Sequence, residues 1–345
     1  MSTMKRWFVP ARLDELPIGA KIVAYLLLGF WSLVVLFPLY WMAITSFKLP
    51  VDVSTGPLYL PFVDFTPHLD AWYYVFVDLG PDTYRPYMNS LIVATCGTAA
   101  CVFLGSMAAY ALARIVYRPP VAAVGLGVLL IGLLIAAVAW GHVDMRIAIA
   151  VAFALFFLLL RPIVRRAHRH LNNDDILFWV VSQRILPPVV TVIPIYLMFR
   201  DAGLLDTHLA LIITYATANL PIVVWLMFDF FDGVPREIEE SAQIDGATRF
   251  SILFGIVLPL VAPGLVATSL LVLILSWNEY LFALFLTTAN AQTMPLLVAA
   301  QNATRGPQWW NMSVLILIMI LPVMLLTLTL QRFIVRGILV GAVKG

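Results

Sequence analysis

Long apolar runs recur along nearly the whole chain, and they constrain its fold more than any other feature. A helix needs about 20 consecutive apolar residues to cross the hydrocarbon core of a bilayer. Here such runs alternate with short segments that hold charged residues, prolines and polar clusters. Only 12% of the residues are charged, whereas soluble domains carry about 25% charge. The chain is therefore predicted to be an all-α membrane protein, a polytopic helical bundle.

We expect about eight transmembrane helices. The fourth has the shortest apolar core, Ile147–Leu160, so it must extend past Arg161 or lie shallow in the bilayer, and a re-entrant hairpin is the alternative. Pro187 and Pro188 should bend or break the fifth, because proline lacks the N–H that a helix needs. The expected spans are residues 22–47, 89–113, 121–139, 147–164, 176–199, 208–231, 262–287 and 311–333.

The lysines and arginines fall mainly on one side of these spans. Positively charged loops tend to stay in the cytoplasm, so both termini are expected to be cytoplasmic. Arg184 lies within a span, and the outside segments hold five: Lys48, Arg85, Arg146, Arg200 and Arg305. The inside segments hold 15: Lys5, Arg6, Arg12, Lys21, Arg114, Arg118, Arg161, Arg165, Arg166, Arg169, Arg236, Arg249, Arg332, Arg336 and Lys344.

Two of the connecting segments have an unusual composition. The largest outside segment, 48–88, combines five aspartates with Trp72 and neighbouring tyrosines, which fits either a docking surface for a soluble partner or an interfacial aromatic belt. The inside segment 161–175 is rich in arginine and contains His168 and His170. Without a third ligand, this segment is predicted to be a basic loop that faces lipid rather than a metal site.

One cytoplasmic segment, residues 232–260, has helical character. Pro235 suits the first position of a helix, and three glutamates in the opening turns favour the positive end of the helix dipole. Gly246 should end this helix, since glycine accepts the left-handed conformation found after helices. The glutamates are Glu237, Glu239 and Glu240.

A second short helix is expected from Ala247 to Pro259, with an apolar stripe at helical spacing. Two short helices joined at a glycine form a compact knob with an acidic side and an apolar side, which suits insertion into a groove of a partner. The alternative is an amphipathic hairpin on the bilayer surface, but such helices usually carry Lys and Arg on the polar face. The stripe is Phe250, Leu253, Phe254 and Val257.

This segment resembles the EAA loop of ABC importer permeases, whose pattern is Glu-Ala-Ala, three residues, Gly, nine residues, Ile, any residue, Leu-Pro. The matching positions, with Ser241 for the first Ala, are Glu240, Ser241, Ala242, Gly246, Ile256, Leu258 and Pro259. In that family the loop forms a coupling helix that sits in a cleft of the ATPase subunit. The resemblance implies an ATPase-coupling role for Glu237, Glu239, Glu240, Ser241, Ala242, Asp245, Gly246, Ala247, Ile256, Leu258 and Pro259.

Further segments are similar to the second permease of carbohydrate-uptake importers of the maltose and polyol kind. They are Tyr87–Ser90, Ala109–Arg114, Ser276–Tyr280 and Gly341–Gly345. The resemblance implies a six-helix core that translocates a sugar or polyol, with a C-terminal tail that reaches the ATPase interface. A transmembrane hairpin at 119–172 is inserted relative to that pattern. The predicted regions are 1–21, a cytoplasmic N-terminal segment; 22–118, two spans with the outside loop 48–88; the hairpin; 173–335, the core with the coupling loop 232–260; and the tail 336–345.

The sequence also lacks the pattern of a nucleotide-binding site. None of its four lysines follows a glycine-rich phosphate-binding turn, so we expect a transporter subunit without its own ATPase site and without a cofactor or metal. ATP and Mg would lie on a partner ATPase. The implied partners are a second permease subunit, an ATPase dimer and an extracytoplasmic substrate-binding protein, in a bacterial inner membrane and without nucleic acid.

Polar groups inside spans are expensive to bury, so each is a candidate for the transport pathway. Arg184 and Glu279 could pair across the pore, although a purely structural pair fits as well. The rival class is an ion-coupled secondary transporter, which would use a midplane acid such as Glu279 together with paired broken helices. No internal repeat is visible, and that reading leaves the acidic loop unexplained. The pathway candidates are Gln183, Arg184, Asn278 and Glu279, with Asn89, Ser90 and Asn219 as weaker ones.

Overall fold

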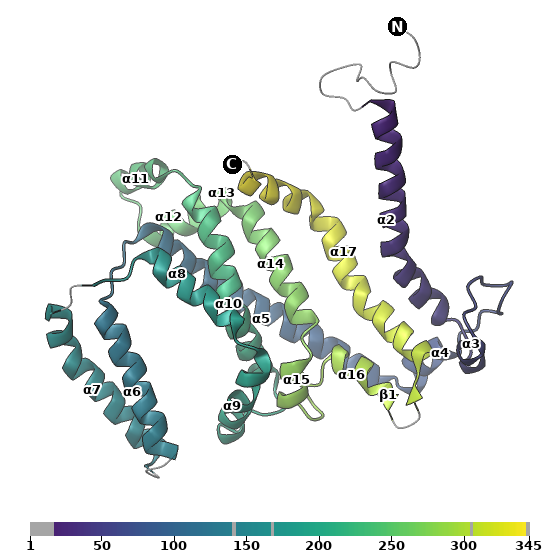
Figure 1. Ribbon diagram of the computed structural model, residues 1–345, viewed down its shortest axis with the longest axis horizontal. Coiled ribbons are helices and arrows are strands. Elements are labelled where there is room, and N and C mark those ends of the chain that lie inside the picture. Colours follow the sequence, from purple (N-terminus) through teal and green to yellow (C-terminus); the bar gives the residue numbers. More distant parts are fainter. Residues whose placement is uncertain (1–16, 140–142, 167–168, 304–305, 343–345) are drawn as a thin grey trace, which may run out of the picture. The chain divides into compact units, whose positions relative to one another are not determined.

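The computed structural model of the protein describes residues 17–139, 143–166, 169–303 and 306–342 (Figure 1). Most of the predicted N-terminal segment, His168 and the last three residues of the tail lie outside the described residues. The chain divides into two compact units, one made of residues 1–90 and 289–325 and the other of residues 91–288 and 326–345. Two long helices, α5 (Pro81–Arg114) and α17 (Trp309–Ala342), contribute to both units.

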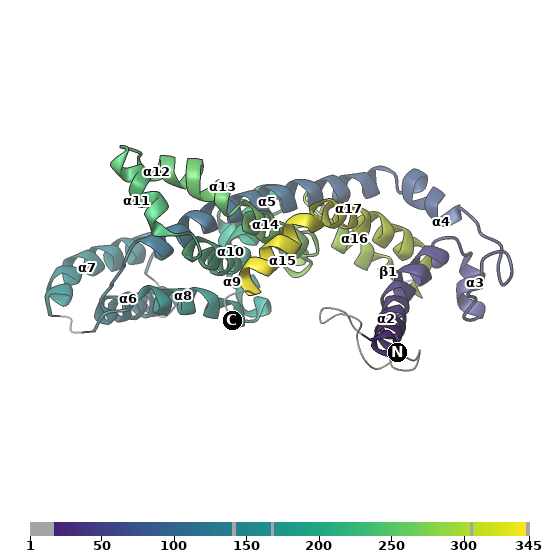
Figure 2. The same cartoon turned by 90° about the horizontal axis from the view of Figure 1, so that it is seen from above.

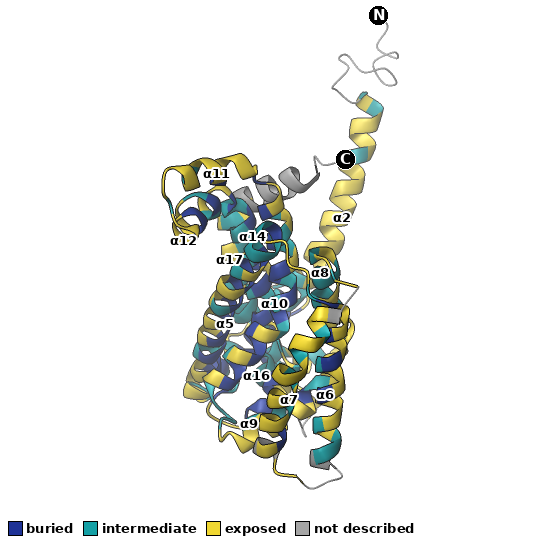
Figure 3. Cartoon of the chain, turned by 90° about the vertical axis from the view of Figure 1, so that its left-hand side faces the viewer, coloured by how far each residue is buried: buried dark blue, intermediate teal, exposed yellow. Residues whose placement is uncertain are grey.

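The first unit begins with an apolar helix, α2 (Ile18–Thr45), that is exposed over most of its length (Figure 3). Ile44 and Thr45, at its end, are buried. Its small core contains Ala71, Val75, Met294, Val314 and Leu315. The other elements of the unit are α3 (Pro50–Thr55), α4 (Asp70–Tyr73), η1 (Tyr74–Asp78), α16 (Met294–Ala300) and an antiparallel pair of two-residue strands, β1 (Asn302–Ala303) and β2 (Gly306–Pro307).

The second unit contains most of the remaining helices. It starts with the part of α5 from Leu91 onward. Its other elements are α6 (Val121–Ala139), α7 (Met145–Arg166), α8 (Asn173–Ser182), η2 (Gln183–Ile185), α9 (Pro188–Asp201), α10 (His208–Asp232), α11 (Arg236–Ile244), α12 (Arg249–Ile252), η3 (Leu253–Val257), α13 (Leu258–Leu260), α14 (Ala262–Trp277) and α15 (Leu281–Leu286).

The apolar helices confirm a polytopic α-helical membrane protein. Within the described ranges, five helices are long and apolar enough to cross a bilayer, or up to seven if each of two bent pairs counts as one span. The apolar part of α6, Val121–Ala137, is shorter, so the expected count of eight is not confirmed. Helix α7 continues past Arg161 to Arg166, the first of the alternatives considered for the fourth span.

The expected break at Pro187 and Pro188 is confirmed. The segments on either side of it, 173–185 and 188–201, meet at 89°, because neither proline has an N–H to continue the helical hydrogen bonds. A second bend of 82° separates Arg249–Leu260 from α14 at Val261.

The expected continuous helix at 262–287 is wrong. Helix α14 ends at Trp277, and α15 begins only at Leu281. The side-chain amide of Asn278 donates to the Ile274 carbonyl at 2.8 Å, and the Glu279 carboxylate accepts from the Phe282 N–H at 3.1 Å. Polar side chains that bond to nearby backbone compete with the helical pattern in this way.

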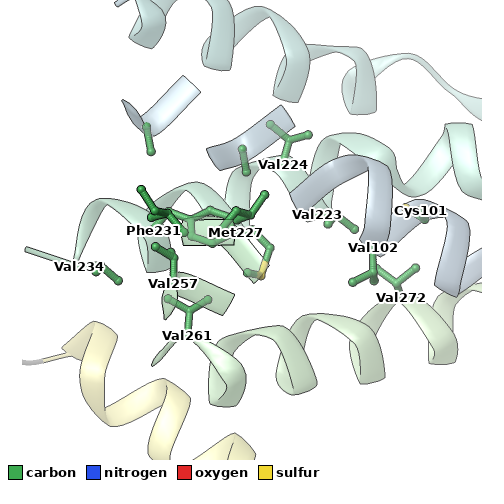
Figure 4. Close-up of a cluster of buried hydrophobic side chains, with 14 of the residues drawn as sticks. Cys101, Val102, Val223, Val224, Met227, Phe231, Val234, Val257, Val261 and Val272 are labelled. Carbon is green, nitrogen blue, oxygen red and sulfur yellow. The ribbon is translucent and has the colours of Figure 1, made fainter. Parts of the chain in front are cut away.

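Close helix packing forms the core of the second unit, where α5, α10, η3 and α14 meet (Figure 4). At Gly105 of α5, an added Cβ would lie 2.6 Å from a methyl group of Val223 in α10. Small residues allow such close approach between membrane helices. The buried cluster includes Cys101, Val102, Val223, Val224, Met227, Phe231, Val257, Val261 and Val272.

Candidate functional site

Residues 236–260, which we name the knob, fold as the two expected helices joined at a glycine turn. Gly246 has a φ of +86°. Its N–H donates to the Gln243 carbonyl, and the Ala247 N–H donates to the Ala242 carbonyl, each at 3.0 Å. This pair of bonds is the Schellman ending of a helix, which satisfies carbonyls that would otherwise lack partners. The predicted stop at Asp245–Gly246 is therefore confirmed.

The second helix begins at Arg249 rather than at Ala247. The Thr248 hydroxyl accepts from the Ser251 N–H at 3.2 Å and so caps α12. Helix α12 then continues through the wider turn η3 into α13, and the chain bends at Val261 into α14. The cap explains the shift of the start, because a threonine in extended conformation before a helix supplies an acceptor for its first amides.

The expected apolar stripe does not form one exposed face. Leu253 and Val257 are buried in the core of the second unit together with Ile252, which the spacing argument missed. Phe254 remains partly exposed and stacks on Phe103 of α5, with ring centroids 6.4 Å apart. The wider turn at η3 shifts the helical register. Residues that would share one face at ordinary α-helical spacing therefore lie partly in the core and partly on the surface.

Glu239 does not belong to the exposed acidic side that the sequence predicted. Its carboxylate is buried, and Oε1 lies 2.6 Å from Nε of Arg114, while Oε2 accepts a hydrogen bond of 2.6 Å from the Tyr110 hydroxyl. Both partners come from the last turns of α5. The carboxylate therefore fixes α11 to the end of that helix.

Arg114 joins three helices at one point. Its Nη2 donates to the carbonyls of Phe231 and Val234, each at 2.8 Å, where α10 ends. A cation is favoured there because the end of a helix carries partial negative charge. Arg236, at the start of α11, donates a hydrogen bond of 3.2 Å to the Ala113 carbonyl of α5. We name the set Tyr110, Arg114 and Glu239 the anchor cluster.

Sequence reasoning did not identify Tyr110 or Arg114 as site residues. Both lie in the segment Ala109–Arg114, which carried part of the family resemblance. The sequence did contain a signal for this contact. Arg114 ends an apolar helix and Glu239 lies in a short amphipathic helix, and opposite charges in such positions can form an ion pair. Nothing in the residue spacing shows that they meet, since they are 125 residues apart.

The outward side of the knob combines acidic and apolar groups. Ile244, just before the glycine turn, is 87% exposed, and Phe250, in the first turn of α12, is 66% exposed. Glu237, Glu240 and Asp245 are also exposed, and Figure 3 shows α11 largely in the exposed colour. Exposed apolar side chains rimmed by polar ones are typical of surfaces that bind another protein.

The four pathway candidates lie in the two breaks described above, and the hypothesised ion pair between Arg184 and Glu279 is not formed. Arg184 in η2 donates to the Ala218 carbonyl at 3.4 Å, whereas the Glu279 carboxylate accepts from the Phe282 N–H in the first turn of α15. Gln183 is exposed in η2, and Asn278 bonds to its own helix end.

The weaker candidates have structural partners. Asn89 donates to the carbonyls of Asn290 and Gln292, each at 2.8 Å, and the Ser90 hydroxyl accepts from the Met294 N–H. Asn219 of α10 bonds to Ser276 of α14 at 3.3 Å. No group of three metal-ligating side chains occurs in the described ranges.

The fold and the knob together define a class: a polytopic membrane protein that presents an anchored two-helix projection between two of its spans. The family described as "Binding-protein-dependent transport system inner membrane component" matches residues 173–340. The chain belongs to the ABC transporter permeases, as a multi-pass inner membrane component of a complex with other subunits.

Individual relatives extend over most of the chain. The probable ABC transporter permease protein y4oR of Sinorhizobium fredii is 30% identical, over 91% of this chain and 94% of that protein. The trehalose/maltose transport system permease protein MalG of Thermococcus litoralis is 29% identical, over 91% and 93%. The diacetylchitobiose uptake system permease protein DasC of Streptomyces coelicolor is 29% identical, over 90% and 92%.

A solved structure supports the fold. A chain in the crystal structure of a bacterial ABC transporter involved in the import of the acidic polysaccharide alginate superposes with a TM-score of 0.60. The two chains are 22% identical, and the match covers 97% of this chain and 99% of that chain.

Proposed function

We propose that the chain is the permease subunit of an ABC importer for a sugar or polyol and that the knob couples it to a separate ATPase. The observation that carries the proposal is the knob itself, which follows the EAA pattern, exposes Ile244 and Phe250, and is tied to the bundle by Glu239. The carbohydrate substrate is supported by relatives named as permeases for trehalose, maltose and diacetylchitobiose.

The anchor cluster suggests how force would pass into the membrane. A coupling element must move as one body with the spans it drives, and it must make different contacts in the two transport states. Through Arg114 the knob is joined to the ends of both α5 and α10. When the ATPase subunits close, a displacement of the exposed side of the knob would shift these two helices together and change the side on which the pathway is open.

The remaining parts of the assembly follow from this role. ATP and Mg would bind to the partner ATPase dimer, a second permease would complete the pathway, and an extracytoplasmic protein would deliver the substrate. Both termini and the knob would face the cytoplasm, as the excess of arginine and lysine predicts. The polar groups at the breaks, Gln183, Arg184, Asn278 and Glu279, remain the pathway candidates, because backbone breaks inside a membrane protein are tolerated where they line a cavity.

The test uses the complete transporter in proteoliposomes. Replacing Ile244 with Asp should abolish co-purification of the ATPase and ATP-driven uptake, because a charge would replace an exposed apolar contact. Val63→Asp is the matched control, since Val63 is 78% exposed in the predicted outside loop, and that variant should retain the ATPase. Full uptake by the Ile244 variant, or uptake that needs an ion gradient instead of ATP, would contradict the proposal.

A further inference from the structure

The hairpin of α6 and α7 has no part in the proposed coupling. At its base, the clasp, the segment before α6 and the segment after α7 are paired by backbone hydrogen bonds. The two helices lie side by side (Figures 1 and 2). At the base, the Val121 N–H donates to the Arg169 carbonyl at 3.0 Å, and the Leu171 N–H donates to the Pro119 carbonyl at 2.9 Å. These bonds hold the segment that enters the hairpin against the segment that leaves it.

Four described arginines lie in or near these segments along the chain. Arg118 and Arg169 belong to the two clasp segments, and Arg161 and Arg165 lie one turn apart on the last part of α7, where side chains four residues apart share a face. All four are exposed. Among the described residues, none of them forms an ion pair or a side-chain hydrogen bond. We name them the arginine collar.

Acidic residues near the collar do not neutralise it. Asp174 and Asp175 begin α8, where carboxylates are stabilised by the helix dipole. The Asp175 carboxylate already accepts from the Asn172 N–H at 2.9 Å. The collar therefore keeps a local excess of positive charge.

The collar directly follows the exposed apolar surface of the hairpin. Phe153, Phe157 and Leu158 of α7 are each more than 60% exposed, and Val128 and Leu129 of α6 are similarly exposed. Figure 3 shows much of α7 in the exposed colour. This apolar run ends at Leu160, one residue before Arg161. Because this run is shorter than the roughly 20 residues of a full span, a hairpin embedded in lipid would hold Arg161 and Arg165 near the headgroups, and long basic side chains there extend toward the phosphates.

We propose that the arginine collar binds the phosphates of anionic phospholipids and thereby makes the inserted hairpin a lipid-binding module of this permease. Guanidinium groups suit this ligand, because their planar N–H groups bind two phosphate oxygens at once. The proposal does not depend on sugar transport or on the knob. It needs only that the apolar faces of α6 and α7 contact the bilayer.

The test presents the purified full-length chain with vesicles of phosphatidylcholine that contain a minor fraction of phosphatidylglycerol. The chain is then re-isolated, and the lipids it retains are measured by mass spectrometry. The wild type should be enriched in phosphatidylglycerol. The double variant Arg161→Gln/Arg165→Gln should lose this enrichment by about fivefold per arginine, which corresponds to ~1 kcal/mol each near an anionic surface. Arg118→Gln/Arg169→Gln should behave alike.

Two controls separate lipid binding from loss of charge or of folding. Arg85→Gln/Arg200→Gln removes two exposed arginines elsewhere and should leave the enrichment intact. Arg161→Lys/Arg165→Lys keeps the charge and should retain most of it. An equal phosphatidylglycerol content in wild type and the Arg161→Gln/Arg165→Gln variant would overturn the proposal.

Discussion

One buried carboxylate, that of Glu239, ties the first helix of the knob to α5. Glu239 and Arg114 have side-chain exposures of 6% and 8%, and their oxygen and nitrogen are 2.6 Å apart. Removing one partner of such a buried pair leaves an uncompensated charge, which costs more than the intact pair contributes. The neighbouring Glu240 is exposed, so two adjacent glutamates in one short helix have different roles.

Glu239→Gln should therefore destabilise the protein by about 3 kcal/mol, because Arg114 would stay buried without its counterion. Thermal unfolding of the purified chain in detergent measures the change. Glu240→Gln is the control and should alter stability by less than about 0.5 kcal/mol, as is usual for an exposed position. Equal unfolding temperatures for the two variants would show that the anchor cluster does not hold α11.

Gly246→Val should uncouple ATP hydrolysis from uptake. A Cβ at this position would meet nothing within 4 Å, so the effect comes from backbone strain, about 1–2 kcal/mol for a left-handed conformation. Relief of that strain would turn the second half of the knob away from its docked orientation. Gly255→Val is the matched control, since that glycine also has open space but no positive φ. The measurement is uptake per ATP hydrolysed in proteoliposomes, and an unchanged ratio for Gly246→Val would count against the turn geometry.

Short elements were predictable where a local rule governs them. The glycine stop after α11 and the break at Pro187 and Pro188 follow from the backbone chemistry of single residues. The interruption after Trp277 escaped prediction because hydropathy ranks the whole run 262–287 as apolar, and it ignores where Asn278 and Glu279 find backbone partners.

The candidate site shows the same division. Its EAA pattern could be found by resemblance to a known family, and two of its three predicted acids, Glu237 and Glu240, are exposed. The anchor cluster could not, because the contact between Arg114 and Glu239 depends on how α5 and α10 cross, and the wider turn at η3 changed which apolar residues face inward. Long-range packing decides both features.

The close crossing of α5 and α10 gives a prediction at the scale of these elements. Gly105→Ala should lower stability by about 1–3 kcal/mol, because the new methyl group would overlap Val223. Val223→Gly in the same chain should restore part of the loss, because it removes both the methyl group at 2.6 Å and the Cβ at 2.7 Å, whereas alanine would keep that Cβ. Gly132→Ala in α6 is the control, as its added methyl group meets nothing within 4 Å. Thermal unfolding of the four proteins checks the argument, and a failure of the second substitution to rescue the first would place the strain elsewhere.

At the scale of the whole molecule, the distribution of lysine and arginine predicts the orientation of the chain in the membrane. The segments expected inside contain the knob, the base of the hairpin and both termini. The segments expected outside contain far fewer basic residues. An orientation deduced from this asymmetry does not depend on whether α6 spans the membrane fully, since a hairpin that turns back within the bilayer leaves every later loop on the same side.

Labelling of single cysteines tests that orientation in intact cells. In a chain with Cys96 and Cys101 replaced by Ala, Ser241→Cys should react with a membrane-impermeant maleimide only after the inner membrane is opened. Val63→Cys, in the outside loop, should react from the outer surface without that step. Both positions are exposed. If one of them did not react, the cause would be that the membrane keeps the reagent away, not that the side chain is buried in the protein. If Ser241→Cys reacted from outside, the knob could not reach a cytoplasmic ATPase, and the coupling role would have to be abandoned even though the permease fold would stand.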